Sequence, residues 1–147
     1  DTYTLSLNTN LQGVTGFRLE VLTDESLPFR GPGRAVNGNL HLTEVRVRIA
    51  PKGQPNQSQI VKLKKATADF NQQAWEISKA IDGDSNTAWG IHPQEGKPHQ
   101  AVFEFEKPVS AEGGSHFTIE LEQAHGREHV IGRFRLSLTN TPVVEIG

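Results

Sequence analysis

The sequence contains neither cysteine nor methionine. The absence of cysteine excludes a disulfide framework, a thiol nucleophile and a zinc-thiolate site. Because methionine is missing even from position 1, we expect the chain to be a processed or excised piece of a longer protein, whose other domains would be its partners. No apolar run is long enough to span a bilayer.

The sequence also has little net charge and few aromatic residues. The formal net charge is -2, so nothing indicates bulk binding to nucleic acid. Aromatic residues make up 7% of the chain, which argues against a flat, cellulose-type binding face. A length of 147 residues suits one domain, and we predict a single domain over residues 1–147.

Hydrophobic and polar residues alternate in four runs. They are GFRLEVL (16–22), AVFEFE (101–106), HFTIELE (116–122) and GRFRLSL (132–138). A period of two residues predicts strands with one buried face and one wet face. Only residues 71–81 suggest a short helix. The pattern predicts an all-β fold, an antiparallel β-sandwich.

The run GNLHLTEVRVRI (38–49) changes parity at Thr43-Glu44. Leu40 and Leu42 share one face, whereas the hydrophobic residues from Val45 onward continue on the other parity. Such a switch predicts a bulge or bend that redirects the Glu44 side chain. The preceding segment, residues 23–38, has no strand pattern and is long for a loop, and long loops are often functional.

The stretch KAIDGDSNTAW, residues 79–89, concentrates oxygen-bearing side chains between Asp82 and Thr87. Asp-Gly and Asn-Thr favour tight turns, so a purely structural turn is one interpretation. The other is a site for a hard cation, which takes six to eight oxygen ligands. The spacing Asp82-x-Asp84-x-Asn86 imitates an EF-hand loop, but the sixth position is Thr87 instead of Gly and the twelfth is Pro93 instead of Glu.

This stretch resembles the signature loop of galactose-binding-like β-sandwiches, such as discoidin or coagulation-factor type C domains, carbohydrate-binding modules and the N-terminal domain of galactose oxidase. The family form is Ala-hydrophobic-Asp-Gly-Asn/Asp-x-x-Thr-x-Trp. Its positions are filled here by Ala80, Ile81, Asp82, Gly83, Asp84, Thr87 and Trp89. The resemblance implies a jelly-roll β-sandwich and an extracellular or periplasmic, secreted domain.

The resemblance also implies a structural calcium ion. Its ligands would be the Lys79 carbonyl, Asp82, Asp84 and Thr87, completed by a Glu of the family's closing strand. The C-terminal TPVVEIG fits that strand poorly, and Thr43 and Glu44 in GNLHLTEVRV fit it better. We therefore expect a circularly permuted arrangement, in which residues 16–22 and 38–47 form the closing hairpin near the N terminus.

In this family the loops at one end of the sandwich bind carbohydrate, and the cation holds their geometry. The candidate ligand-binding residues on predicted loops are Phe29, Arg30, Arg34, Asn37, His92, His125 and Arg127. Two guanidinium groups in RGPGR (30–34) favour an acidic or sulfated polysaccharide or oligosaccharide. Alternatively, these arginines pair with Asp24 and Glu25, and the loop histidines are merely solvated. Both tryptophans are expected in the core.

No catalytic motif is present: the sequence lacks GxSxG, HExxH, a P-loop and GxGxxG. We therefore predict a binding domain and not an enzyme. The alternative is a protein-interaction or assembly domain without a sugar site. Membrane binding is not expected, because Leu27-Pro28-Phe29 is the one candidate for an apolar spike.

Overall fold

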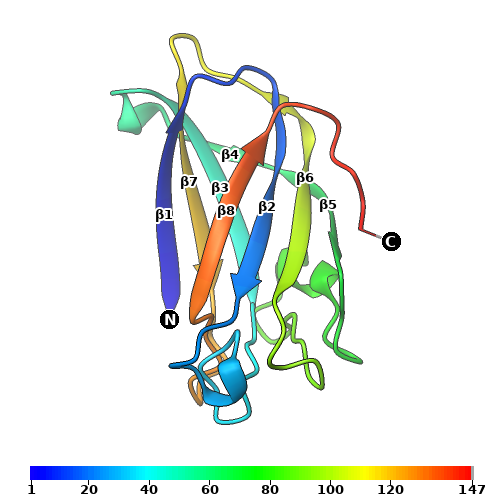
Figure 1. Cartoon of the computed structure of the whole chain (residues 1–147). Helices are drawn as coiled ribbons and strands as arrows, with labels where there is room; N and C mark the ends of the chain where they lie inside the picture. The colour runs from blue at the N-terminus through cyan, green and yellow to red at the C-terminus, as the bar shows by residue number, and fades with distance from the viewer. Residues whose placement is uncertain (147) are drawn as a thin grey trace.

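The computed structural model describes residues 1–146 and has an all-β fold of two four-stranded antiparallel sheets (Figure 1). The first sheet has the order β1 (Thr2–Thr9), β7 (Ser115–Glu122), β3 (Glu44–Pro51), β4 (Gln59–Val61). The second has the order β5 (Leu63–Ala68), β6 (His99–Val109), β2 (Val14–Leu22), β8 (Arg133–Thr139). The predicted β-sandwich class is confirmed.

Helical structure is limited to 3-10 turns in residues 1–146. They are η1 (Pro28–Arg30), η2 (Pro55–Gln57) and η3 (Ile77–Ile81). The expected helix over residues 71–81 therefore exists only as its last turn. None of the helical turns in the described part of the chain is long and apolar enough to cross a membrane.

Inward-facing residues of both sheets form the core. Phe17 of β2 stacks on Phe103 of β6 with ring centroids 4.8 Å apart, and Phe105 stacks on Phe117 of β7 across the sheets. These residues lie at the alternating positions predicted from the sequence, and full burial of each such side chain contributes roughly 1.5–3 kcal/mol. The hydrophobic residues of β8 are only half-buried, because β8 is an edge strand.

The expected closing hairpin is wrong. β2 and β3 lie in different sheets: β2 pairs with β6 and β8, whereas β3 pairs with β7 and β4. The two strands share the core but no hydrogen bonds join them as a ladder. Their connection crosses from one sheet to the other.

The hydrophobic positions change parity before β3 because the backbone changes its hydrogen-bond partner there. Leu42 pairs with Trp89, with N–O distances of 3.0 and 2.9 Å. The next amide, that of Thr43, instead donates to the Glu122 carbonyl of β7 at 2.8 Å. As a result Leu42, Thr43 and Glu44 are all buried in succession, and the Glu44 side chain is withdrawn from solvent.

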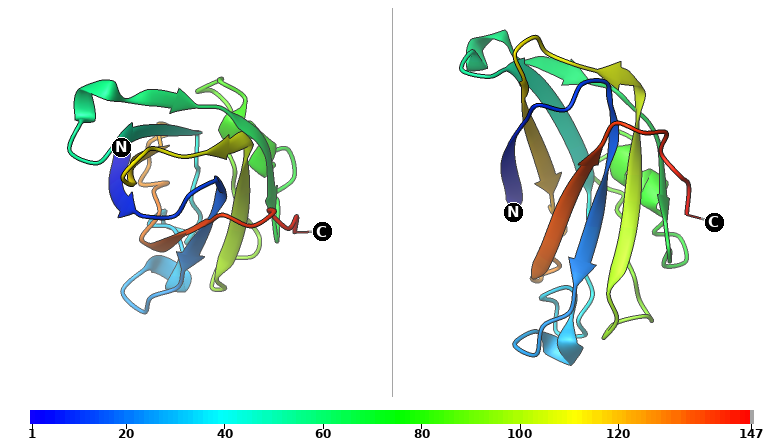
Figure 2. Two further views of the ribbon diagram at one scale, coloured as in Figure 1. Left: turned by 90° about the horizontal axis from the view of Figure 1, so that it is seen from above. Right: turned by 45° about the horizontal axis from the view of Figure 1, so that its top comes forward.

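The three long connections all lie at one end of the sandwich, at the bottom of Figure 1. They span residues 23–43, 69–98 and 123–132. The opposite end carries the turns at 10–13, 52–58 and 110–114 (Figure 2). The fold therefore gathers most of its irregular backbone on one surface.

Candidate functional site

The loop after η3 folds around the Thr87 hydroxyl. Thr87 Oγ1 lies 2.5 Å from Asp82 Oδ2, 3.0 Å from the Asp84 carbonyl oxygen and 3.3 Å from the Lys79 carbonyl oxygen. A hydroxyl has one hydrogen and cannot donate fully to three acceptors. The loop therefore concentrates four oxygen atoms around one point, all from residues predicted to bind the cation.

Asp82 and Asp84 also shape the loop itself. Asp82 Oδ1 accepts a hydrogen bond from the Asp84 amide, and Asp84 Oδ1 accepts one from the Asn86 amide, both at 2.9 Å. These contacts are the side-chain-to-backbone turns expected of aspartate. The structural-turn interpretation thus describes part of the loop correctly. The Asp84 carboxylate caps the turn, and it is the Asp84 carbonyl that lies beside Thr87.

Glu44 reaches this loop from the start of β3. The Gly83 amide donates to Glu44 Oε1 at 2.8 Å, which brings the Glu44 carboxyl into the neighbourhood of Asp82. Burial raises the pKa of Glu44 from 4.5 to about 7, opposed by the Gly83 hydrogen bond and assisted by the nearby Asp82 charge. Glu44 therefore meets the predicted loop at Gly83, the residue that follows Asp82.

The pKa of Asp82 shifts in the other direction. Partial burial opposes ionisation, but hydrogen bonds from the Thr87 hydroxyl and the Asp84 amide outweigh it and lower the pKa of Asp82. The pKa values of the two neighbouring carboxyl groups thus shift in opposite directions: that of Glu44 is raised and that of Asp82 is lowered.

Thr43 is positioned differently from the other predicted ligands. Its hydroxyl accepts a hydrogen bond from the Ala124 amide at 2.8 Å, which ties the connection after β7 to the start of β3. The side chain is fully buried and does not join the loop around Thr87. The Thr43 hydroxyl is therefore not part of the oxygen cluster.

The donor set suits a hard divalent cation in kind and charge. The Asp82 carboxylate lies beside one hydroxyl and two backbone carbonyls, and Glu44 reaches the same loop at the Gly83 amide. Hard cations such as calcium bind oxygen ligands of these kinds. Across residues 1–146, no three His, Cys, Asp or Glu side chains converge as a metal site. Any cation here would depend on the backbone carbonyls and the hydroxyl as well as the carboxylates.

A separate open pocket of about 360 Å³ lies at the same end of the sandwich. Phe29, Asn37, His92 and Glu95 line it. Three of these four were predicted as ligand-binding residues. Glu95 was not, because nothing in its local sequence sets it apart. Its Oε2 accepts a hydrogen bond from His92 Nδ1 at 2.7 Å.

Two amide side chains, the buried Asn39 and the half-buried Gln72, hold the walls of this pocket together. Asn39 Nδ2 donates to Gln72 Oε1 at 2.9 Å, and Asn39 Oδ1 accepts from the Ile91 amide at 3.0 Å. Gln72 Oε1 also accepts from the His92 amide at 3.1 Å, and the Asn39 amide donates to Asn37 Oδ1 at 3.0 Å. Together with the His92–Glu95 contact, these bonds link Asn37, His92 and Glu95 in a continuous network.

The remaining predicted ligand residues lie outside the pocket. Arg30, Arg34 and Arg127 are exposed. Within residues 1–146, none of these arginines makes an ion pair within 4.0 Å. The alternative pairing with Asp24 or Glu25 is thus not formed, and Asp24 Oδ1 accepts hydrogen bonds from the Ser26 amide and hydroxyl instead.

His125 belongs to an aromatic cluster beside the pocket. His41 stacks between Trp75 and His129, with ring centroids 4.3 and 4.1 Å away, and His125 packs edge-on against His41 at 5.2 Å. Burial, followed by the charges of His129 and His125, lowers the pKa of His41 to about 4. Trp75 is half-buried here, whereas Trp89 is fully buried in the core as predicted.

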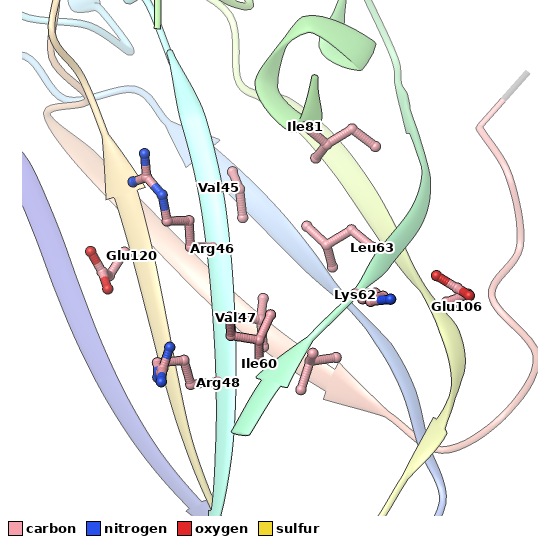
Figure 3. Close-up of a pocket in the computed structure, with 11 residues that line it drawn as sticks. Val45, Arg46, Val47, Arg48, Ile60, Lys62, Leu63, Ile81, Glu106 and Glu120 are labelled. Carbon is pink, nitrogen blue, oxygen red and sulfur yellow. The ribbon is translucent and has the colours of Figure 1, made fainter. Parts of the chain in front are cut away.

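A third feature is an apolar slot of about 380 Å³ on the side of the sandwich, where β3 and β4 face β5 and η3. Val45, Val47 and Ile60 line one side, and Leu63 and Ile81 line the other (Figure 3). Charged side chains also line the slot: Arg46, Arg48, Lys62, Glu106 and Glu120. Ile60 is 71% exposed.

Comparisons with protein-family models, with curated proteins and with solved structures found no match for this chain. The resemblance of residues 79–89 to galactose-binding-like domains therefore depends on the loop residues and on their meeting with Glu44.

Proposed function

We propose that this chain is a non-catalytic carbohydrate-binding module with a structural calcium site, acting outside the cytoplasm. The observation that supports it most is the pocket of Phe29, Asn37, His92 and Glu95 at the same end as the oxygen-rich loop. Sugar sites combine an aromatic face for the ring with a few oriented polar groups for the hydroxyls. This pocket contains both.

Phe29 supplies the aromatic face. Its side chain is 74% exposed, and its backbone has φ 48°, a left-handed conformation that is costly for a bulky residue. Because the Phe29 ring is exposed, it adds no stability to the core that could offset the backbone strain. Packing of the ring against a ligand would explain why the strained conformation is kept.

In this proposal calcium acts as a structural ion and carries out no chemistry. Glu44, Asp82, Thr87 and the carbonyls of Lys79 and Asp84 would hold it. The chain then runs directly from Thr87 through Trp89 to His92. Because the Trp89 backbone is paired with Leu42, a cation that holds the loop also holds the segment that presents His92.

The proposal is tested by affinity electrophoresis through gels that contain soluble neutral or anionic polysaccharides. Retardation of the wild-type chain by at least one polymer is expected. Phe29→Ala and His92→Ala should lose it, while Leu11→Ala, an exposed residue at the opposite end, should keep it. Equal mobility of all variants in every gel would contradict a sugar site at this pocket.

A second candidate function is protein interaction through the slot between β3 and β5. The supporting observation is the exposed Ile60 at the mouth of an apolar slot, since apolar surface patches often mark interfaces. Sedimentation velocity of the wild-type chain and of Ile60→Lys tests self-association through this slot. A dimer that the substitution dissociates would favour the interaction function.

A further inference from the structure

Glu95 is the pocket residue that defines the charge of the site. Its side chain is only 12% exposed, so the carboxylate is largely withdrawn from water. One oxygen, Oε2, is engaged by His92. The other oxygen, Oε1, accepts no hydrogen bond from residues 1–146. Glu95 lines the pocket, so this oxygen is free to accept one from a ligand.

No lysine or arginine compensates this carboxylate. Across residues 1–146, the one charged-group contact of Glu95 within 4.0 Å is His92. The nearby Lys97 directs its ammonium group to Gln94 Oε1 at 2.8 Å. Arg30 and Arg34 do not line the pocket. A partly desolvated carboxylate without a lysine or arginine partner repels an anionic group more strongly than an exposed one does, because screening by water is weaker.

Resting on the proposed function, we infer that this pocket takes a neutral sugar, that Glu95 accepts hydrogen bonds from its hydroxyls, and that Glu95 excludes uronate or sulfate groups from the pocket. A carboxylate accepts hydrogen bonds from two adjacent hydroxyls. Asn37 and His92 supply further polar contacts, and Phe29 packs on the apolar face of the ring. This assignment differs from the acidic or sulfated ligand suggested by Arg30 and Arg34.

The position of Glu95 is defined by close backbone packing. A Cβ atom added at Gly38, where φ is +88°, would lie 2.7 Å from the Pro28 carbonyl oxygen and 3.4 Å from Glu95 Cβ. The Gly96 amide donates to the Gly31 carbonyl at 2.7 Å. The Gly38 backbone therefore packs beside Glu95, and the hydrogen bond of Gly96 fixes the adjacent backbone, which is the preorganisation that selective recognition requires.

The experiment compares neutral galactan with polygalacturonate, and galactomannan with alginate, by affinity electrophoresis and titration calorimetry at pH 7. The wild-type chain should bind at least one neutral polymer and neither anionic polymer. Glu95→Gln removes the charge at nearly constant volume and should weaken neutral binding by about tenfold or more. Glu112→Gln, the same change in an exposed turn at the opposite end, should leave it unchanged.

A second variant, Glu95→Asp, keeps the charge and withdraws it by one methylene. It should weaken neutral binding and still exclude the anionic polymers, so the inference stays testable if Glu95→Gln folds poorly. Tighter binding of polygalacturonate than of galactan, or unchanged neutral affinity in Glu95→Gln, would overturn the inference while carbohydrate binding itself stands. Absence of binding to all four polymers would overturn both.

Discussion

At the residue scale, the most informative group is the buried carboxyl of Glu44. In the folded, metal-free chain its pKa is about 7, against 4.5 for an ordinary glutamate, because burial disfavours the charged form. The folded state therefore binds a proton that the unfolded state has already released between these two pH values. Stability falls as pH rises through this window, by a total on the order of 3 kcal/mol.

We predict that Glu44→Gln stabilises the metal-free chain at pH 8 by about 2–3 kcal/mol. The amide keeps an acceptor for the Gly83 amide and a donor for Asp82 but carries no charge to bury. The measurement is urea unfolding in the presence of a chelator at pH 4.5 and pH 8. Equal stability of the variant and the wild type at pH 8 would show that Glu44 ionises there without cost.

His41 produces the opposite pH dependence. Its pKa falls from 6.5 to about 4 because burial disfavours the imidazolium. Between these values the unfolded chain binds a proton that the folded chain refuses, so the His41 contribution to stability rises with pH. Over roughly pH 4.5–6.5 the contributions of Glu44 and His41 therefore oppose each other.

We predict that the free energy of unfolding of His41→Phe falls as pH rises, because only the Glu44 contribution remains. That of Glu44→Gln should rise with pH, because only the His41 contribution remains. Phenylalanine keeps the stack on Trp75 and His129, and it costs no hydrogen bond because His41 Nδ1 has no partner within residues 1–146. Unfolding free energies of the metal-free variants at pH 4.5, 5.5 and 6.5 give both slopes. Slopes of the same sign in the two variants would contradict the assignment.

At the scale of elements, the connection between β2 and β3 depends on close packing at Gly33. A Cβ atom added there would lie 1.8 Å from the Asn39 carbonyl oxygen, which cannot move as the end of a side chain could. The Gly33 amide also donates to the Gly38 carbonyl at 2.9 Å. This contact folds the segment that carries Phe29 and Asn37 back on itself.

We predict that Gly33→Ala destabilises the chain by about 2–3 kcal/mol and removes carbohydrate retention. Gly53→Ala is the control: φ is +76° but no atom lies within 4 Å of the added Cβ, so only backbone strain of about 1 kcal/mol is expected. Urea unfolding and affinity electrophoresis measure the two effects. A Gly33→Ala chain that keeps both stability and retention would show that this loop does not position the pocket.

The elements also show what the sequence could and could not predict. Alternation identified the core-facing residues of β2, β6 and β7, because burial follows the two-residue period directly. It could not predict that β2 and β3 lie in opposite sheets, because strands of both sheets face the same core and show the same pattern. Glu44 was predictable because a parity change marks it, whereas the role of Glu95 arises only when two distant connections meet.

At the scale of the whole molecule, one end of the sandwich carries the oxygen-rich loop, the pocket and the aromatic cluster. The backbone between them is continuous: the Gln72 amide donates to the Gly90 carbonyl, and the Gly90 amide donates to the Trp75 carbonyl. Ordering any one of these three features therefore restricts the others. A cation at the loop would stabilise the whole end, and its effect would appear in global unfolding.

We predict that calcium at 100 times its dissociation constant stabilises the chain by about 2.7 kcal/mol, which raises Tm by about 5–10 °C for a chain of this size. Asp82→Asn should abolish the shift, because Asp82 supplies the carboxylate oxygen beside the Thr87 hydroxyl. Asp84→Asn should keep much of it, because the Asp84 carboxylate caps the turn and only its carbonyl faces Thr87. Calorimetric scans in calcium and in chelator measure all three chains. An identical wild-type Tm in both buffers would mean that residues 79–89 form a turn and bind no cation.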